Sequence, residues 1–206
     1  MSVFEGGGSS GLVRRVQDIL LRPAATWEKI DTEAATIRGL FTGYIVILAA
    51  IGPVSQFLGG LLFGGFLFGP ASLAGAIVGY GLALVATYVM ALVIDALAPS
   101  FGGQKNPVQA MKVSAYSGTA AWLAGIFQLA PMLAWLGIVG LYSLYLLYLG
   151  LPRLMKAPAD KALGYTAVVV VVMILVYAVI GGVVVSITGR GAMGAMGAAT
   201  MASAMN

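Results

Sequence analysis

Residues 163–187 have the sequence LGYTAVVVVVMILVYAVIGGVVVSI and contain no charged side chain. A helix needs about 20 residues to cross the hydrocarbon core of a bilayer, and this stretch is long enough to do so. A run of valines alone is also typical of a buried β-strand, but such strands are much shorter. The stretch therefore predicts a membrane-spanning helix, and the composition of the chain supports the same interpretation for its neighbours.

The composition is that of a membrane protein. Of the 206 residues, 60% are apolar and 9% are charged, whereas soluble domains have about 45–50% apolar and about 25% charged residues. A soluble fold of this size could not enclose so much apolar surface, but lipid accepts it directly. The sequence therefore predicts an all-α integral membrane protein. Basic loops beside the membrane explain the net charge of +4, so no nucleic-acid partner is expected.

Four further stretches with at most one charged residue are long enough to span a bilayer. The five predicted spans are residues 39–63, 71–97, 113–130, 132–151 and 163–187. The third and fourth come from one uncharged stretch of about twice the required length, and Pro131 near its middle is the expected hairpin point. Pro53 is expected to kink the first span. The predicted architecture is a bundle of five transmembrane helices.

Residues 12–38 predict amphipathic helices ahead of the first span. Their apolar positions include Leu12, Val16, Ile19, Leu20 and Trp27. Two arrangements are compatible with this pattern: the helices lie along the membrane surface as interfacial helices, or they pack on the cytoplasmic ends of the bundle. The flanking segments 1–11 and 188–206 are glycine-rich, and we expect both to be disordered.

Basic residues fall on one side of a five-span arrangement. All lysines and arginines except Arg190 lie before the first span, between the second and third spans, or between the fourth and fifth. The positive-inside rule assigns that side to the cytoplasm. We therefore expect a multi-pass protein of the cell inner (plasma) membrane, with its N-terminus in the cytoplasm and its C-terminus on the opposite side.

Four groups of short motifs follow one another along residues 12–187. They are 15–23 (RVQDILLRP) with 27–30 (WEKI) and Glu33; 101–103 (FGG) with 110–117 (AMKVSAYS); 130–131 (AP) with 140–145 (GLYSLY) and 149–151 (LGL); and 161–162 (KA). In order and spacing they resemble the Yip (Ypt-interacting protein) family, in particular its bacterial branch. The resemblance implies five membrane helices, a cytoplasmic N-terminal region and a non-enzymatic role.

The same resemblance bears on partners. Eukaryotic relatives interact with Rab-type small GTPases and take part in vesicle traffic and membrane shaping. This sequence has neither their long cytosolic N-terminal domain nor the Asp-Leu-Tyr-Gly-Pro motif that they carry before their spans. A small GTPase partner is therefore not expected. The expected partners are the lipid bilayer, other membrane proteins and further copies of the chain.

Asp95 is the main candidate for a functional side chain because ionisable groups within spans are costly and often functional. It lies near the cytoplasmic end of the second span. One hypothesis is a structural ion pair with a loop cation, for which the candidates are Lys105, Lys112 and Arg153. Helix N-capping by the carboxylate is a second structural option. The other hypothesis is an ion- or proton-coupled role.

Glycines four residues apart indicate close helix packing. The pairs Gly60 and Gly64, and Gly75 and Gly79, have the small-xxx-small spacing that lets helix backbones approach one another. They fit packing within the bundle or between copies of the chain. Tyr142, Tyr145 and Tyr148 likewise fit packing and interfacial anchoring better than a ligand site.

Catalysis and metal binding have little support. The sequence contains no cysteine and no histidine, which removes thiolate nucleophiles and the commonest general base and metal ligand. No catalytic residue, cofactor or metal site is predicted. The leading functional hypothesis is a membrane scaffold or adaptor. The alternative is a small transporter or channel, with a path lined by Pro53, Gln56, Gln128 and Asp95.

Overall fold

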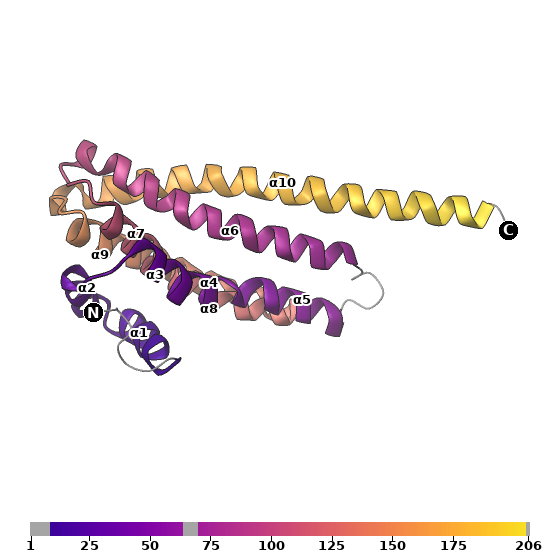
Figure 1. Ribbon diagram of the computed structural model, residues 1–206, viewed down its shortest axis with the longest axis horizontal. Coiled ribbons are helices and arrows are strands. Elements are labelled where there is room, and N and C mark those ends of the chain that lie inside the picture. The colour runs from indigo at the N-terminus through magenta and orange to yellow at the C-terminus, as the bar shows by residue number, and fades with distance from the viewer. Residues whose placement is uncertain (1–8, 64–69, 205–206) are drawn as a thin grey trace.

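The computed structural model describes residues 9–63 and 70–204. Every regular element in this part of the chain is a helix, which confirms the all-α prediction. The long helices run alongside one another, and the two N-terminal helices lie at one end of the bundle (Figure 1). We call this end the N-terminal end.

The N-terminal segment forms two helices, α1 (Ser9–Leu21) and α2 (Pro23–Thr32). Pro23 occupies the first turn of α2, where a missing N–H leaves no hydrogen bond unmade. The Thr26 hydroxyl donates to the carbonyl oxygens of Asp18 (2.9 Å) and Arg22 (2.7 Å), and so ties the turn between the helices together. This pair corresponds to the amphipathic helices predicted within residues 12–38.

The first long helical run starts after the N-cap residue Thr36, whose side chain accepts from the backbone N–H of Gly39 at 3.0 Å. The run comprises α3 (Ile37–Leu40), the π-helical turn η1 (Phe41–Ile45), α4 (Val46–Ala49) and α5 (Ile51–Phe63). It is interrupted at Ala50, between α4 and α5. Pro53 explains the break, because it has no N–H to donate to the carbonyl four residues earlier.

The second long helix, α6 (Pro70–Leu97), continues into the 3-10 turn η3 (Ala98–Phe101) and ends at Gly102. Gly102 has a φ of 74°, a left-handed conformation that glycine adopts without steric cost. The chain then returns through α7 (Pro107–Ser117), α8 (Thr119–Ala124) and η4 (Gly125–Leu129). Asn106 caps α7 by accepting from the Gln109 N–H at 3.1 Å.

The predicted hairpin at Pro131 is confirmed. Ala130 has an extended backbone (φ −123°, ψ 120°), and the chain then turns back through η5 (Pro131–Leu141) into α9 (Tyr142–Leu154). Both α8 and η4 pack against η5, as the two arms of a hairpin do. After the short turn η6 (Ala159–Lys161), α10 (Ala162–Ala204) packs along α6 and α9.

The two segments expected to be disordered lie partly outside the described residues. Residues 9–11 belong to α1. The tail differs from the expectation, because α10 continues through residues 188–204 and extends past the other helices (Figure 1). Alanine and methionine are among the better helix formers, and they continue a helix that the preceding span has already nucleated.

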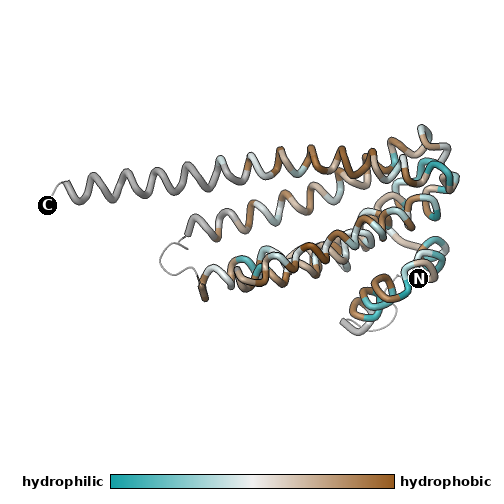
Figure 2. Tube along the Cα trace, turned by 180° about the vertical axis from the view of Figure 1, so that it is seen from behind, coloured by the Kyte–Doolittle hydropathy of each residue, from teal (hydrophilic) through white to brown (hydrophobic). Residues whose placement is uncertain are grey.

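Among the described residues, four helical runs are long and apolar enough to cross a membrane: Ile37–Phe63, Ala76–Phe101, Met132–Leu154 and Ala159–Val183. The chain is therefore a multi-pass membrane protein. Figure 2 shows apolar residues along the long helices and hydrophilic residues gathered at the N-terminal end. Many large apolar side chains on these helices are exposed, as lipid-facing residues are. The predicted span at 113–130 is not among the four.

Within the part of the chain that the structure describes, residues 110–117 form the longest unbroken run of buried residues. Every residue from 110 to 117 is buried, including the polar residues Lys112, Ser114 and Ser117. The segment 107–129 packs against α6 and α9 through α7, and against α5 through η4. Polar side chains lower its hydropathy, and several of them bond protein neighbours, as when the Ser114 hydroxyl donates to the Thr87 carbonyl at 2.7 Å.

Candidate functional site

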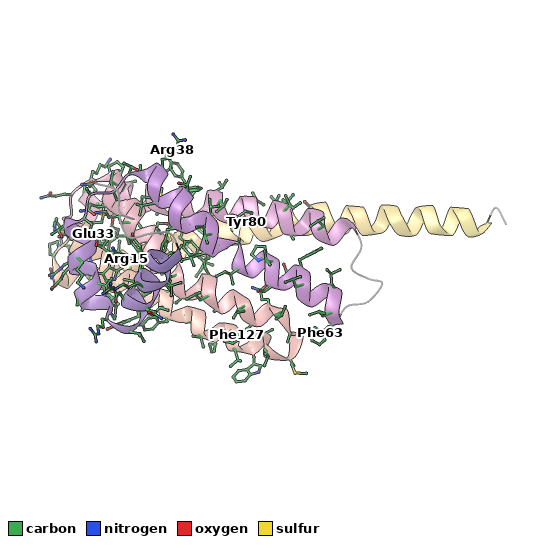
Figure 3. The ribbon with its side chains drawn as sticks, turned by 60° about the horizontal axis from the view of Figure 1, so that its bottom comes forward. Arg15, Glu33, Arg38, Phe63, Tyr80 and Phe127 are labelled. Carbon is green, nitrogen blue, oxygen red and sulfur yellow. The ribbon has the colours of Figure 1, made fainter. Side chains whose placement is uncertain are left out.

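The N-terminal helices are held on the bundle by charged side chains. The Arg15 Nη2 atom on α1 lies 2.7 and 2.8 Å from the two carboxylate oxygens of Glu33, just after α2. The Arg15 guanidinium carbon also lies 5.8 Å from the centre of the Tyr116 ring on α7, within cation–π range. Burial acts to lower the pKa of Arg15, but the bonded Glu33 carboxylate together with Tyr116 and Tyr44 outweighs it, and the pKa is raised. Figure 3 shows Arg15 and Glu33 together at the N-terminal end.

Lys112 of α7 provides the second anchor. Only 3% of the residue is exposed, and its ammonium donates to the carbonyl oxygens of Ile30 (2.8 Å) and Glu33 (2.6 Å). These carbonyls belong to the C-terminal end of α2, where helix carbonyls lack intrahelical partners and the dipole favours a cation. We call Arg15, Glu33 and Lys112 the clasp.

One turn earlier on α7, Gln109 reinforces the clasp. Its side-chain amide donates to the backbone oxygen of Asp31 at 3.1 Å and to its carboxylate at 3.2 Å. Gln109 and Lys112 are three residues apart and therefore share one face of α7. That face caps the end of α2, so α2 and α7 are joined by polar contacts as well as by packing.

Aromatic side chains fill the space beneath the clasp. Trp27 meets the edge of Tyr116, with ring centres 6.3 Å apart, and Tyr44 packs on the other side with ring centres 4.8 Å apart. The Tyr44 hydroxyl bonds the Thr119 hydroxyl at 2.7 Å. Trp27 lies so close to Gly150 of α9 that a β-carbon there would come within 2.7 Å of the indole ring. The clasp therefore encloses a packed junction of α2, η1, α7 and α9.

The model of the Yip1 domain family matches residues 18–180. This match covers most of the chain and includes the clasp residues Glu33 and Lys112. The chain belongs to the Yip1 domain family. No curated protein and no solved structure matches it. Members of this family are generally non-enzymatic membrane proteins.

The Yip1 domain does not bring Asp95 to the cations expected for it. Lys112 bonds α2, and Arg153 forms an ion pair with Glu28. Lys105 is exposed in the loop before α7. Within the described residues, the buried Oδ1 of Asp95 has no hydrogen-bond partner. The expected ion pair of Asp95 therefore does not form. Lys112 instead bonds carbonyl oxygens at the end of α2, and Arg153 pairs with the Glu28 carboxylate.

The surroundings of Asp95 are aromatic. On α10, Tyr165 is fully buried, and its hydroxyl donates to the carbonyl of Ile94, the residue before Asp95. Phe101 stacks on the Tyr165 ring with centres 4.9 Å apart and planes 6° apart. These contacts hold the end of α6 against α10 without using the Asp95 carboxylate.

Replacing Asp95 with asparagine is expected to leave the thermal unfolding temperature in detergent unchanged or higher. The substitution removes a partly buried charge and breaks no ion pair in the described structure, and such charges oppose folding. An ion-paired Asp95 would give the opposite sign. A clear fall in the unfolding temperature of Asp95→Asn, with Asp160→Asn unchanged as an exposed control, would show that the carboxylate has a partner after all.

The apolar residues predicted to face apolar surroundings do so by packing on the bundle. Ile19 and Trp27 are buried, and Leu12, Val16 and Leu20 are partly buried against the same core. The Tyr142 hydroxyl on α9 donates to the Leu20 carbonyl at 3.0 Å. Of the two arrangements left open by the sequence, these contacts match packing on the bundle. Val13 and Leu21 stay exposed on the outer side of α1.

Of the four glycines expected to mark close packing, the contacts are described for Gly79. A β-carbon on Gly79 would meet nothing within 4 Å, and Gly60 is buried. Gly64 lies outside the described residues, and the surroundings of Gly75 are not described. Close approaches occur elsewhere: a β-carbon on Gly125 would lie 2.7 Å from the Gly52 α-carbon, and one on Gly59 would overlap the Leu129 carbonyl. Gly79 is therefore not at a close contact, while the expectation for Gly60, Gly64 and Gly75 stays a prediction.

Arg15, Glu33 and Gln109 are site residues for which the sequence suggested no individual role. A local signal does exist for two of the clasp residues. Arg15 lies four residues before Ile19 and thus beside the apolar face of α1, and Lys112 interrupts an otherwise uncharged helix face. A charge among apolar positions marks a buried pairing, although it does not name the partner.

Replacing Arg15 with glutamine is expected to loosen α1 and α2 from the bundle. A hydrogen bond between charged groups contributes about 1.5 kcal/mol or more when partly buried, so opening of the segment should rise about tenfold. Trypsin cleavage after Lys29, which requires local opening of α2, measures this in lipid nanodiscs. Arg14→Gln is the matched control because Arg14 is exposed on the same helix. Equal cleavage rates in the two variants would contradict the clasp.

Proposed function

We propose that this Yip1 domain protein, of the family's bacterial branch, is a non-enzymatic membrane scaffold or adaptor. It interacts with membrane proteins, with lipid or with further copies of itself. The observation that supports this role most directly is the clasp, which uses a buried lysine and a part-buried arginine to fix two N-terminal helices on the bundle. The charged groups of the molecule are thus used to build a defined surface at the N-terminal end.

The transporter alternative has less support from the geometry. Gln56 on α5 and Gln128 on η4 are exposed, and α5 and η4 pack against each other. Asp95 lies near the C-terminal end of α6, where the carbonyl of the preceding residue, Ile94, accepts from Tyr165 of α10. Polar groups that line a transport path would face a shared interior. The residues suggested for a path are therefore distributed over separate faces.

A five-span topology with a cytoplasmic N-terminus is part of the proposal. The loops at both ends of the α7–α9 unit lie together, since the Gln104 N–H donates to the Met155 carbonyl at 2.7 Å. Because α9 ends at this place and the hairpin at Ala130 lies at the far end of η5, the segment 107–129 has to connect the two ends. This supports a crossing by 107–129 in addition to the four apolar runs.

The topology is tested by labelling single cysteines, and the chain offers a clean background because it contains no cysteine. Cysteines at positions 5, 104 and 160 are expected to react from the cytoplasmic side with a membrane-impermeant maleimide. Cysteines at positions 66 and 200 are expected to react from the opposite side. A cytoplasmic label at position 200 would exclude the five-span topology.

The scaffold role is tested by two measurements on the purified protein and on native membranes. Proteoliposomes are expected to show no proton or ion flux above empty liposomes. A photo-crosslinker at position 29, on the exposed side of α2, is expected to give discrete adducts in native membranes. The same adducts should be lost in a clasp variant. Specific flux, together with adducts that persist in the clasp variant, would favour the transporter instead.

A further inference from the structure

A charged groove lies between α2 and the end of α9. Its larger part is a hollow of about 510 Å³ lined by Glu28, Asp31, Thr32, Pro152, Arg153 and Lys156. An adjoining hollow of about 330 Å³ shares Glu28, Pro152 and Arg153, and adds mainly apolar residues such as Ala24, Leu149 and Ala159. Because they share three lining residues, the two hollows form one groove, which we call the α2–α9 groove. It has a charged part and an apolar part.

The groove lies where a spanning helix leaves the membrane. Pro152 and Arg153 are in the last turn of the apolar run Met132–Leu154, and the next run begins at Ala159. Side chains at such positions meet the lipid headgroups, which occupy the layer just outside the hydrocarbon core. A ligand from the bilayer therefore reaches this groove without leaving its own leaflet.

The charged part contains two acids facing two bases. Glu28 and Asp31 are three residues apart and share one face of α2, and they form ion pairs with Arg153 and Lys156 respectively. All four side chains keep contact with solvent, with exposed fractions between 20% and 61%. Exposed ion pairs of this kind are weak and exchange partners readily. The groove therefore offers both signs of charge to a ligand.

The backbone at Lys156 ends α9. Lys156 has a φ of 55°, a left-handed conformation, and is the first residue beyond the Met155 C-cap. Helices commonly end with one residue in this conformation. Here it places the lysine at the mouth of the groove opposite Asp31, beyond the end of α9.

The combination of charges selects the chemistry of the ligand. A simple anion would pair with Arg153 and Lys156 but leave two carboxylates without partners. A simple cation would pair with Glu28 and Asp31 but leave Arg153 and Lys156 without partners. We propose that the α2–α9 groove binds the headgroup of phosphatidylethanolamine, whose phosphate accepts from Arg153 and Lys156 while its ammonium donates to Glu28 and Asp31. The apolar part of the groove receives the glycerol and the start of an acyl chain.

Two other common headgroups fit less well for stated reasons. The quaternary ammonium of phosphatidylcholine has no N–H to donate to a carboxylate. Phosphatidylglycerol carries the phosphate but no cation, so Glu28 and Asp31 would repel it or stay unpaired. The expected order of binding is therefore phosphatidylethanolamine, then phosphatidylcholine, then phosphatidylglycerol.

The experiment uses the full chain in nanodiscs that contain the three lipids in equal amounts, followed by native mass spectrometry of the released protein. Retained phosphatidylethanolamine is expected to exceed phosphatidylglycerol by about threefold or more. Glu28→Gln should lower this preference by about threefold to fivefold, the size expected for one exposed charge pair. Arg153→Gln removes a contact to the phosphate that all three lipids carry, so it should lower the retention of all three and leave the preference in place. The matched controls, Asp160→Asn and Lys105→Gln, change exposed charges in loops at the same end that do not line the groove.

Each outcome decides for or against the groove. Equal retention of the three lipids by the wild-type chain overturns the proposal without need of any variant. A preference for phosphatidylglycerol that is lost only in Arg153→Gln shows a plain anion site and also overturns it. So does an equal loss in Lys105→Gln. The proposal deepens the lipid interaction of the proposed scaffold, but crosslinking at position 29 in nanodiscs without phosphatidylethanolamine tests the scaffold separately.

Discussion

Replacing Lys112 with methionine is expected to lower the free energy of unfolding by about 3 kcal/mol. The methionine fills a similar volume but cannot donate to the carbonyl oxygens of Ile30 and Glu33, which Lys112 contacts at 2.8 and 2.6 Å. Both carbonyls are then left without that partner at a site where the lysine is only 3% exposed. The result is two orphaned acceptors at the end of α2, in addition to the loss of charge-assisted bonds.

The measurement is unfolding of the purified protein in detergent by sodium dodecyl sulfate, followed by circular dichroism. Lys105→Met is the control because Lys105 is exposed in the loop that precedes α7. The Lys112→Met protein should also expose Lys29 to trypsin, as the Arg15 variant does. If Lys112→Met is as stable as Lys105→Met, the end of α2 does not depend on α7.

The positions of the helices were largely predictable from the sequence because a bilayer imposes length. The predicted span 71–97 differs from α6 by one residue at its start, and the hairpin falls at Pro131, after an extended Ala130 of the kind that a following proline favours. The break in the first span is at Ala50, three residues before Pro53. Length and proline act locally, so these features can be inferred without knowledge of the neighbours.

The partners of the charged residues could not be inferred in the same way. Lys112 and Glu33 are 79 residues apart, and no local pattern connects them. Lys112 and Arg153 were plausible partners of Asp95 because all three were placed at one end of the bundle. The packing of α2 on α7 and α9 decides the outcome, since it brings carbonyls and carboxylates closer to these cations than Asp95 is.

The apolar face of α1 shows a similar limit. Amphipathicity predicts that Ile19 and Leu20 face an apolar environment, and they do, but lipid and protein both satisfy that requirement. The position of Arg15 indicates, in retrospect, that protein rather than lipid covers this face. A guanidinium beside that apolar face needs a carboxylate and an aromatic ring, which Glu33 and Tyr116 supply within the protein.

Replacing Gly59 with alanine is expected to destabilise the bundle by about 2 kcal/mol, the typical effect of overpacking a tight contact. A β-carbon at this position would overlap the Leu129 carbonyl oxygen and lie 2.8 Å from that of Gln128. These are backbone atoms, so they cannot move aside as a flexible side chain would, and α5 has to shift away from η4.

The same substitution at Gly79 meets nothing within 4 Å. Gly79→Ala is therefore expected to be neutral or to stabilise α6 by up to about 1 kcal/mol through helix propensity. Both variants add one methyl group to a glycine within an apolar span, so the difference between their unfolding midpoints isolates the helix contact. Equal midpoints would show that α5 and η4 do not approach as closely as the structure places them.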